Sequence, residues 1–222
     1  FIGNVQPTAP KEEKKLCFEP VSAAEACRMA KASGKVAIIT EGAQTGIFTE
    51  IRNITVAVCE NGAYHAACGS AEDFKEIISD NEIIKYGYDL KLQRNILSHN
   101  GINLRGRLMD IELMHYLINP EKSHKVEILA KSYLDINLEE CLPEKKEEAP
   151  LSLFDEAPEE EAAADERFPE AVATLQLGDA IWKEMEEADL CGLYERMEEP
   201  LLAVLSDMEM EGVKIDLPQL RK

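Results

Sequence analysis

The chain has 222 residues, 45% of them hydrophobic, which is enough for one sizeable core with extensions. Its formal net charge of −19 argues against a protein that binds nucleic acid by itself, because phosphates are contacted mainly by Lys and Arg. The sequence contains no run of about 18 apolar residues that could cross a membrane. Six cysteines without a Cys-x-x-Cys pair, beside four histidines, predict reduced thiols in a cytoplasmic protein rather than a metal site.

The first third of the chain alternates helix and strand signals. Residues 1–16 are polar, with two prolines and a Lys/Glu run, and predict a linker. The apolar spacing that follows predicts a helix over Ser22–Ala32, strands over Lys35–Glu41, Asn53–Glu60 and Ala63–Cys68, and a helix over Ala71–Ser79. Asn61-Gly62, between the last two strands, is a strong two-residue hairpin signal.

The central stretch predicts a strand followed by two helices. An apolar run over Glu82–Tyr86 indicates a buried strand. Asp89 can cap the next helix, which Asn100-Gly101 ends because Gly tolerates a left-handed conformation. Asp110 opens a second helix, which stops at Asn119-Pro120. Periodicity alone therefore supports an α/β protein.

Several stretches, in one order, carry a resemblance to a known family. The first is Gly-x-x-Leu-Lys-x-x-x-x-x-Leu within residues 85–119, followed by Gly-Ile, Gly, Asp and Tyr-Leu-Ile-Asn-Pro. Leu-Ala-Lys-Ser-Tyr-Leu at 129–134 and Thr-Leu-Gln-Leu at 174–177 continue it. Glu-Glu-Pro-Leu-Leu-Ala-Val-Leu at 198–205 and Met-Glu-Met-Glu-Gly-Val-Lys-Ile-Asp at 208–216 resemble the start of a polymerase domain. Together these resemble the 3′–5′ exonuclease (proofreading) domain of a bacterial family A DNA polymerase I over most of residues 35–222.

The resemblance implies a ribonuclease-H-like (DnaQ-like) fold, with a mixed central sheet flanked by helices. It implies an exonuclease-like domain over residues 17–189, and a connector helix with the start of a truncated polymerase domain over 190–222. Polymerase chemistry would lie downstream in the same chain, and DNA would be reached through the full-length enzyme of replication and repair. The start at Phe1, without an initiator or signal peptide, agrees with a fragment of a longer cytoplasmic protein that contacts no membrane.

The first two catalytic motifs of the resembled family are altered in this chain. Hydrolysis of a phosphodiester by two metal ions needs several Asp or Glu oxygens, and Mg²⁺ accepts few other ligands. In the family's Asp-x-Glu motif, Ile39 stands at the Asp position and Glu41 at the Glu position. In its Asn-x-x-x-Asp motif, Asp89 stands at the Asn position and Gln93 at the Asp position. A neutral amide loses most of the Coulomb attraction for a divalent ion, and we expect Asp89 to be a helix cap.

The third motif, Tyr-x-x-x-Asp, places Glu166 at the Tyr position and Glu170 at the Asp position. The Tyr that orients the attacking water in the family is absent, and Glu170 also fits first-turn dipole complementation on a helix that begins at Phe168-Pro169. We therefore expect a vestigial exonuclease centre that needs no cofactor. The alternative is an active nuclease with a rearranged Mg²⁺ or Mn²⁺ site, whose candidate ligands are Glu41, Asp89, Asp110 and Glu170.

An acidic segment precedes the third motif. Residues 144–166 hold ten Asp or Glu and two Lys, which predicts a mobile loop over about 143–167 that repels DNA. Within it, Leu151, Leu153 and Phe154 resemble the peptide by which replication proteins dock on the sliding clamp. The alternative is that Leu153 and Phe154 pack onto the domain.

Two helices are predicted at the C-terminal end. One runs from Phe168 to about Ala188, with Trp182 as a packing anchor. Its predicted inner face is a stripe made by Ala171, Leu175, Ile181 and Met185. The other runs over Leu190–Glu211, is interrupted or bent at Pro200, and exposes Leu and Met side chains. Four basic residues near the would-be site offer weak DNA contacts or, as we expect, solvated surface charge: Lys91, Arg94, Arg105 and Arg107.

Overall fold

The computed structural model describes residues 15–45, 48–141, 159–214, 216 and 219. The elements follow in this order: β1 (Glu19–Pro20), α1 (Ala23–Ser33), β2 (Lys35–Thr45), β3 (Phe48–Glu60), β4 (Ala63–Gly69), α2 (Ala71–Ile78), β5 (Ile84–Gly87), α3 (Leu90–His99), β6 (Leu108–Asp110), α4 (Ile111–Ile118), α5 (Val126–Leu129), a π-helical turn (Ala130–Leu134), a 3₁₀ turn (Glu139–Cys141), α6 (Glu159–Glu187), α7 (Cys191–Leu193), a second π-helical turn (Tyr194–Glu198) and α8 (Glu199–Glu211).

The strands form one six-stranded mixed sheet in the order β1-β4-β3-β2-β5-β6. The pairs β2–β3 and β3–β4 are antiparallel, whereas β1–β4, β2–β5 and β5–β6 are parallel. The β3–β4 hairpin turns at Asn61 and Gly62, whose φ angles of 52° and 85° are the left-handed values that such a tight turn requires. The predicted meander and hairpin are confirmed, and the short strand β6 was not predicted.

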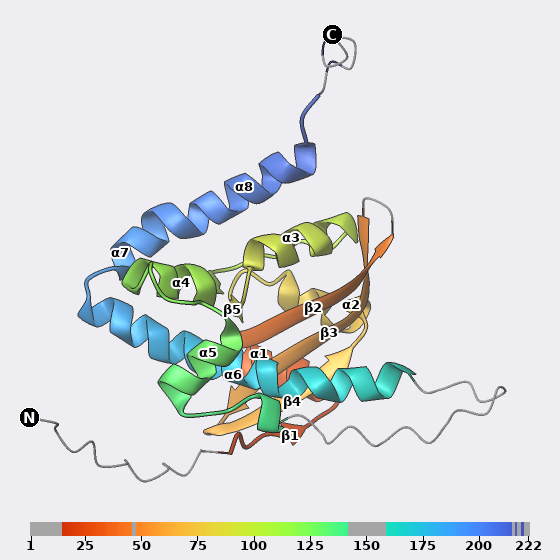
Figure 1. Cartoon of the computed structure of the whole chain (residues 1–222). Coiled ribbons are helices and arrows are strands. Elements are labelled where there is room, and N and C mark those ends of the chain that lie inside the picture. The colour runs from red at the N-terminus through yellow and green to blue at the C-terminus, as the bar shows by residue number, and fades with distance from the viewer. Residues whose placement is uncertain (1–14, 46–47, 142–158, 215, 217–218, 220–222) are drawn as a thin grey trace, which may run out of the picture.

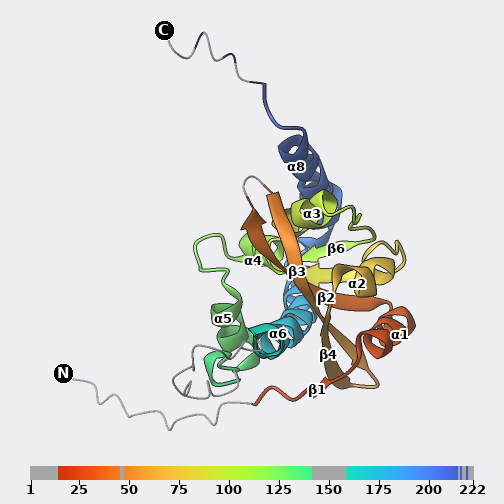
Figure 2. The same cartoon turned by 90° about the vertical axis from the view of Figure 1, so that its right-hand side faces the viewer.

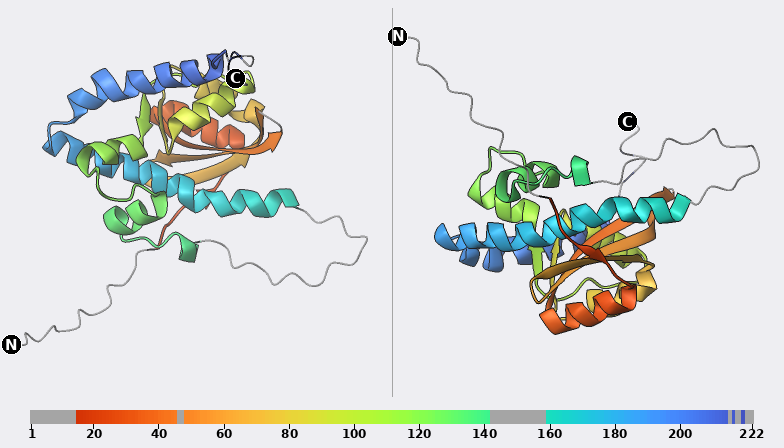
Figure 3. Two further views of the ribbon diagram at one scale, coloured as in Figure 1. Left: turned by 45° about the horizontal axis from the view of Figure 1, so that its top comes forward. Right: turned by 90° about the horizontal axis from the view of Figure 1, so that it is seen from below.

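Helices cover both faces of the sheet (Figures 1 and 2). One apolar cluster joins the sheet to α4, α5 and α6, and a second joins it to α1, α2 and α3. The long helix α6 crosses the sheet and contacts β2, β3, β4 and β5 (Figure 3). It lies very close to β5 at Gly178, where an added Cβ would fall 2.0 Å from the Tyr86 ring. The predicted inner face of this helix is confirmed by the buried side chains of Ala171, Leu175, Ile181 and Met185.

Helix α6 begins earlier than predicted. It starts at Glu159, so the acidic segment is helical from there on and Pro169 lies inside the helix. Glu170 is therefore not a first-turn residue, and the expectation that it complements a helix terminus there was wrong. The clamp-docking hypothesis for Leu151, Leu153 and Phe154 falls outside the residues that the structure describes.

The predicted helix over 190–211 is broken into α7, a π-helical turn and α8. The break comes just before Pro200, whose ring nitrogen has no hydrogen for the carbonyl one turn earlier. Tyr194 anchors this region, because its hydroxyl donates to the Leu108 carbonyl at 2.8 Å and accepts from the Asp110 amide at 2.8 Å. Fixed in this way, α8 lies along α3 and contacts β6 (Figure 1).

Three of the four basic residues near the would-be site pair with these C-terminal helices. Lys91 lies 2.6 Å from Glu209, and Arg94 lies 2.7 Å from Asp207. Arg107 lies 2.5 Å from Glu195, with its guanidinium 4.5 Å from the centre of the Trp182 ring. The side chains of these three remain partly exposed, so the predicted surface charge is present but held in ion pairs, and the alternative of weak DNA contacts stays a prediction.

Candidate functional site

The first motif position lies at an irregular point of the sheet. Ile39 pairs with Thr55 of β3 and packs, partly buried, against the apolar cluster under α6. The pairing of β2 and β3 shifts register between Glu41 and Gly42, and a β-bulge of this kind re-aims the neighbouring side chain. Gly42 is required there, because an added Cβ would fall 2.1 Å from a Thr49 methyl.

Gln93, at the second motif position, is built into the fold. Its side chain is 7% exposed. The amide Nε2 donates to the Tyr88 carbonyl at 2.9 Å. Its Oε1 accepts from the Thr40 amide at 3.1 Å and from the Thr40 hydroxyl at 3.2 Å. Gln93 thus ties α3 to β2, and both halves of its amide are used in doing so.

Asp89 and Asp110 hold helix ends. Asp89 caps α3 by accepting from the Leu92 amide at 3.1 Å, which confirms the predicted cap. Asp110, 2% exposed, accepts from the amides of Glu112 and Leu113 at the start of α4, as predicted, at 3.0 and 3.4 Å.

Asp110 also accepts from the Leu90 amide of α3 at 2.7 Å, a link that the sequence did not reveal. One buried carboxyl therefore joins the starts of two helices. Burial raises its pKa to about 7, against the opposing effect of the three backbone hydrogen bonds.

Glu41 and Glu170 come together, and a cation lies between them. Arg167 Nε donates to Glu41 Oε1 at 2.7 Å, and its terminal nitrogen donates to Glu170 Oε2 at 2.5 Å. Sequence reasoning overlooked Arg167, although an Arg three residues before a Glu on a helix is a recognisable pairing signal. Glu166 lies in α6, outside the residues whose side chains are described.

These residues do not fit a two-metal centre. Two of the four candidate carboxylates bind backbone amides at helix starts, and the other two hold a guanidinium. Within the described parts of the chain, no group of three or more His, Cys, Asp or Glu side chains is placed to hold a metal ion. Glu41, Asp89, Asp110 and Glu170, the candidates for a rearranged site, are therefore not gathered into one cluster in the described part of the chain.

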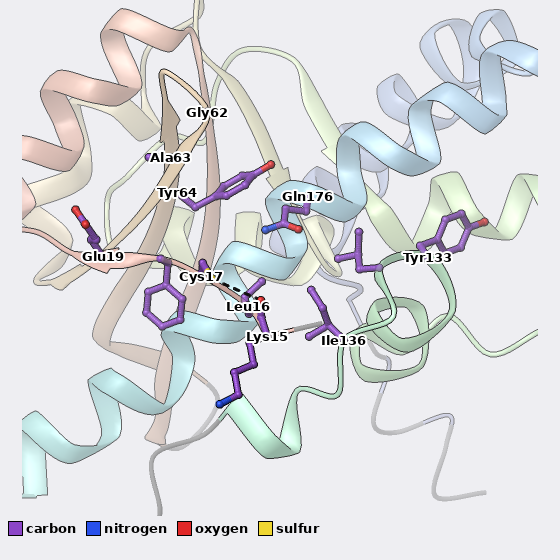
Figure 4. A pocket seen from close by; sticks show the side chains of 12 residues that line it. Lys15, Leu16, Cys17, Glu19, Gly62, Ala63, Tyr64, Tyr133, Ile136 and Gln176 are labelled. Atoms are coloured by element: carbon purple, nitrogen blue, oxygen red, sulfur yellow. Dashed lines mark hydrogen bonds between the residues drawn. The ribbon is translucent and has the colours of Figure 1, made fainter. Parts of the chain in front are cut away.

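An open cavity lies away from all of these positions. It has a volume of about 720 Å³ and lies between the segment around β1, the start of β4, the first π-helical turn and α6 (Figure 4). Tyr64, Tyr133 and Gln176 line it, and Glu19 is the one acidic residue among the described residues of this lining. This lining offers no cluster of carboxylates for hydrolysis.

Comparisons with known proteins agree with this architecture. The family described as DNA polymerase I, ribonuclease H-like domain, matches residues 54–140. DNA polymerase I of Bacillus subtilis is 31% identical over 171 residues, which cover 74% of this chain. The chain belongs to the DNA polymerase I family. It corresponds to the exonuclease-like domain and spans 19% of the length of that relative.

A further relative resembles the chain in sequence, and two solved structures resemble it in fold. DNA polymerase I of Synechocystis is 28% identical over 66% of this chain and 15% of its own length. The polymerase of Mycobacterium smegmatis, solved with primer-template DNA and dNTP, superposes with a TM-score of 0.69 at 23% identity, over 90% of this chain and 32% of that one. Escherichia coli RNase D superposes with a TM-score of 0.63 at 14% identity, over 87% of this chain and 51% of that one.

These likenesses confirm the predicted ribonuclease H-like fold of the polymerase I domain. The described helices of the domain include none that is both long and apolar enough to span a membrane.

Proposed function

We propose that this chain is the exonuclease-like domain of a cytoplasmic DNA polymerase I in which the nuclease centre is vestigial. The domain then serves as a structural brace for the polymerase domain of the same protein in replication and repair. Gln93 carries this proposal: a buried neutral amide, engaged with Thr40 and Tyr88, stands where the family motif has an essential Asp.

The chemistry of the donor set points the same way. A divalent ion bound by hard oxygen ligands depends on carboxylate charge, which neither an isoleucine nor an amide supplies. Ile39 packs, partly buried, against the apolar cluster instead, and the side-chain oxygen of Gln93 accepts a hydrogen bond from Thr40 of β2. With both positions neutral, the site lacks the charge to hold two metal ions and activate water.

The C-terminal region supports the brace. Tyr194 is fully buried and bonds to the backbone of β6. Glu199 accepts from the Leu108 amide at 2.8 Å, so a second side chain from this region reaches the same strand. A connector tied to the sheet in this way transmits a fixed orientation to whatever follows it, which is what a bracing domain requires.

Titration with Mn²⁺, together with an assay of 3′-end degradation on single-stranded DNA, tests the proposal. We expect no degradation by the wild-type chain and no Mn²⁺ binding tighter than about 1 mM, the range of weak oxygen-ligand sites. The triple variant Ile39→Asp, Gln93→Asp, Arg167→Gln returns two carboxylates and removes the competing cation, so we expect it to gain a tighter Mn²⁺ site.

A matched control comes from the opposite side of the sheet. Arg28→Gln removes an exposed guanidinium that pairs with Glu60 alone, and we expect it to leave Mn²⁺ binding unchanged. Tight binding of two ions by the wild-type chain, or degradation of 3′ ends that Glu41→Gln abolishes, would show that the domain is a working nuclease.

A further inference from the structure

We propose that the Arg167 guanidinium is a built-in cation that replaces a divalent metal between Glu41 and Glu170 and pins α6 to β2. The inference rests on the proposed loss of the nuclease centre. It goes further by explaining why two acidic motif positions persist in a site that no longer needs them for hydrolysis.

The geometry is that of a shared counterion. Glu41 of β2 lies 2.7 Å from Nε of the Arg167 guanidinium, and Glu170 of α6 lies 2.5 Å from a terminal nitrogen of the same group. The side chains of Glu41 and Glu170 are 22% and 27% exposed, and that of Arg167 is 43% exposed. Arg suits this position because it stays charged and its N–H groups have fixed directions.

Both sides of the contact are held by packing. Arg167 precedes Phe168 and Pro169, which are buried, and the Phe168 ring packs edge-on against Phe18 with centroids 6.2 Å apart. On the other side, Glu41 lies at the bulge of β2. Both backbones are therefore fixed, so only the side chains have to be ordered when the contact forms.

The number of available oxygen ligands explains the exchange of cation. Two carboxylates that converge without a cation repel each other. Two metal ions need more carboxylate oxygens than Glu41 and Glu170 supply. A guanidinium carries one positive charge and needs only hydrogen-bond acceptors, so these two carboxylates satisfy it. Burial lowers the pKa of Arg167, but the hydrogen bonds and negative charges of Glu170 and Glu41 together outweigh it and leave that pKa above its usual range.

Thermal unfolding with and without roughly 5 mM Mn²⁺, a concentration above weak oxygen-ligand affinities, tests the inference. We expect Mn²⁺ to leave the midpoint of the wild-type chain unchanged. We expect Arg167→Gln to lower the midpoint by about 2–4 °C. Mn²⁺ should then restore at least half of that loss, because the ion can sit between the two freed carboxylates.

Two further variants separate this account from a generic salt effect. The triple variant Glu41→Gln, Glu170→Gln, Arg167→Gln has no charge to neutralise, so Mn²⁺ should leave its midpoint unchanged. Arg28→Gln frees one carboxylate, that of Glu60, and should likewise show no response to Mn²⁺.

The outcomes distinguish the two proposals. If Arg167→Gln unfolds at the wild-type midpoint, or if its loss is not reversed by Mn²⁺, then Arg167 is not a substitute cation, whether or not the centre is vestigial. If the wild-type chain itself binds Mn²⁺ tightly and degrades 3′ ends, the proposed loss of the nuclease centre is wrong, and the inference that rests on it fails as well.

Discussion

Two regions of the domain use carboxyl groups in different ways. One is the motif edge, formed by Glu41, Arg167 and Glu170, and the other is the junction under the C-terminal helices, formed by Asp110 and Tyr194. At the motif edge, Glu41 and Glu170 are partly exposed and share the charged side chain of Arg167. At the junction, the buried carboxyl of Asp110 accepts hydrogen bonds from backbone amides. The backbone amide of Asp110, in β6, donates to the hydroxyl of Tyr194.

The difference shows how charge is accommodated at different depths. A partly exposed carboxylate can keep its charge if a cation is held beside it, at modest net gain. A buried carboxyl must be hydrogen-bonded on most of its lone pairs, and burial still raises its pKa. We therefore expect changes at the junction to cost more stability than changes at the motif edge.

The largest effect is expected at Asp110. Asp110→Ala leaves the amides of Leu90, Glu112 and Leu113 without their acceptor, and each buried unpaired donor costs about 1–3 kcal/mol. We expect the free energy of unfolding in urea to fall by about 3 kcal/mol or more. Asp89→Ala is the control, since it removes one cap bond and should cost about 1 kcal/mol. Equal losses in the two variants would contradict the contrast between the regions.

A pH dependence follows from the same carboxyl group. The pKa of Asp110 is raised from an ordinary 3.8 to about 7, so the folded state binds its proton more tightly than the unfolded state does. That contribution to stability is complete below 3.8 and is lost as the pH rises to about 7, by at most about 1.4 kcal/mol per pH unit.

Unfolding of the wild-type chain and of Asp110→Asn between about pH 4 and pH 8 measures this contribution. The stability of the wild-type chain relative to the variant should fall across that interval. A difference that grows with pH would instead mean that the three backbone donors outweigh burial and favour the ionised form.

A smaller effect is expected where the C-terminal helices meet α3. Arg94 donates to the Ser206 hydroxyl at 2.6 Å and pairs with Asp207, and its side chain is only one-fifth exposed. Arg94→Met should cost about 1 kcal/mol and speed amide exchange in α8. Lys91→Met removes a more exposed pair with Glu209 and should have a smaller effect that vanishes in high salt. Exchange in α8 that neither variant changes would show that Tyr194 and the apolar contacts hold this helix alone.

Local signals were sufficient for most of the fold. The Asn61-Gly62 turn, the caps at Asp89 and Asp110 and the inner face of α6 all depend on neighbours within a few residues, and all were predicted correctly. The start of α6 was missed because Pro169 indicates a helix start, while the structure has it inside the helix. Strand β6 is only three residues long, too short for an alternation pattern to appear.

The motif substitutions at Ile39 and Gln93 are visible in the sequence, since they follow from residue identity and order along the chain. The ion-pair partners of Arg167 and Lys91 are not visible in the sequence. In all, 126 positions separate Arg167 from Glu41, and 118 separate Lys91 from Glu209. Side chains so far apart meet only when packed helices and strands bring their backbones together. The sequence alone therefore determines the fold family and the residue types at the motif positions. Tertiary packing determines which cation fills the site and which helices hold the connector, because both depend on distances across the folded chain.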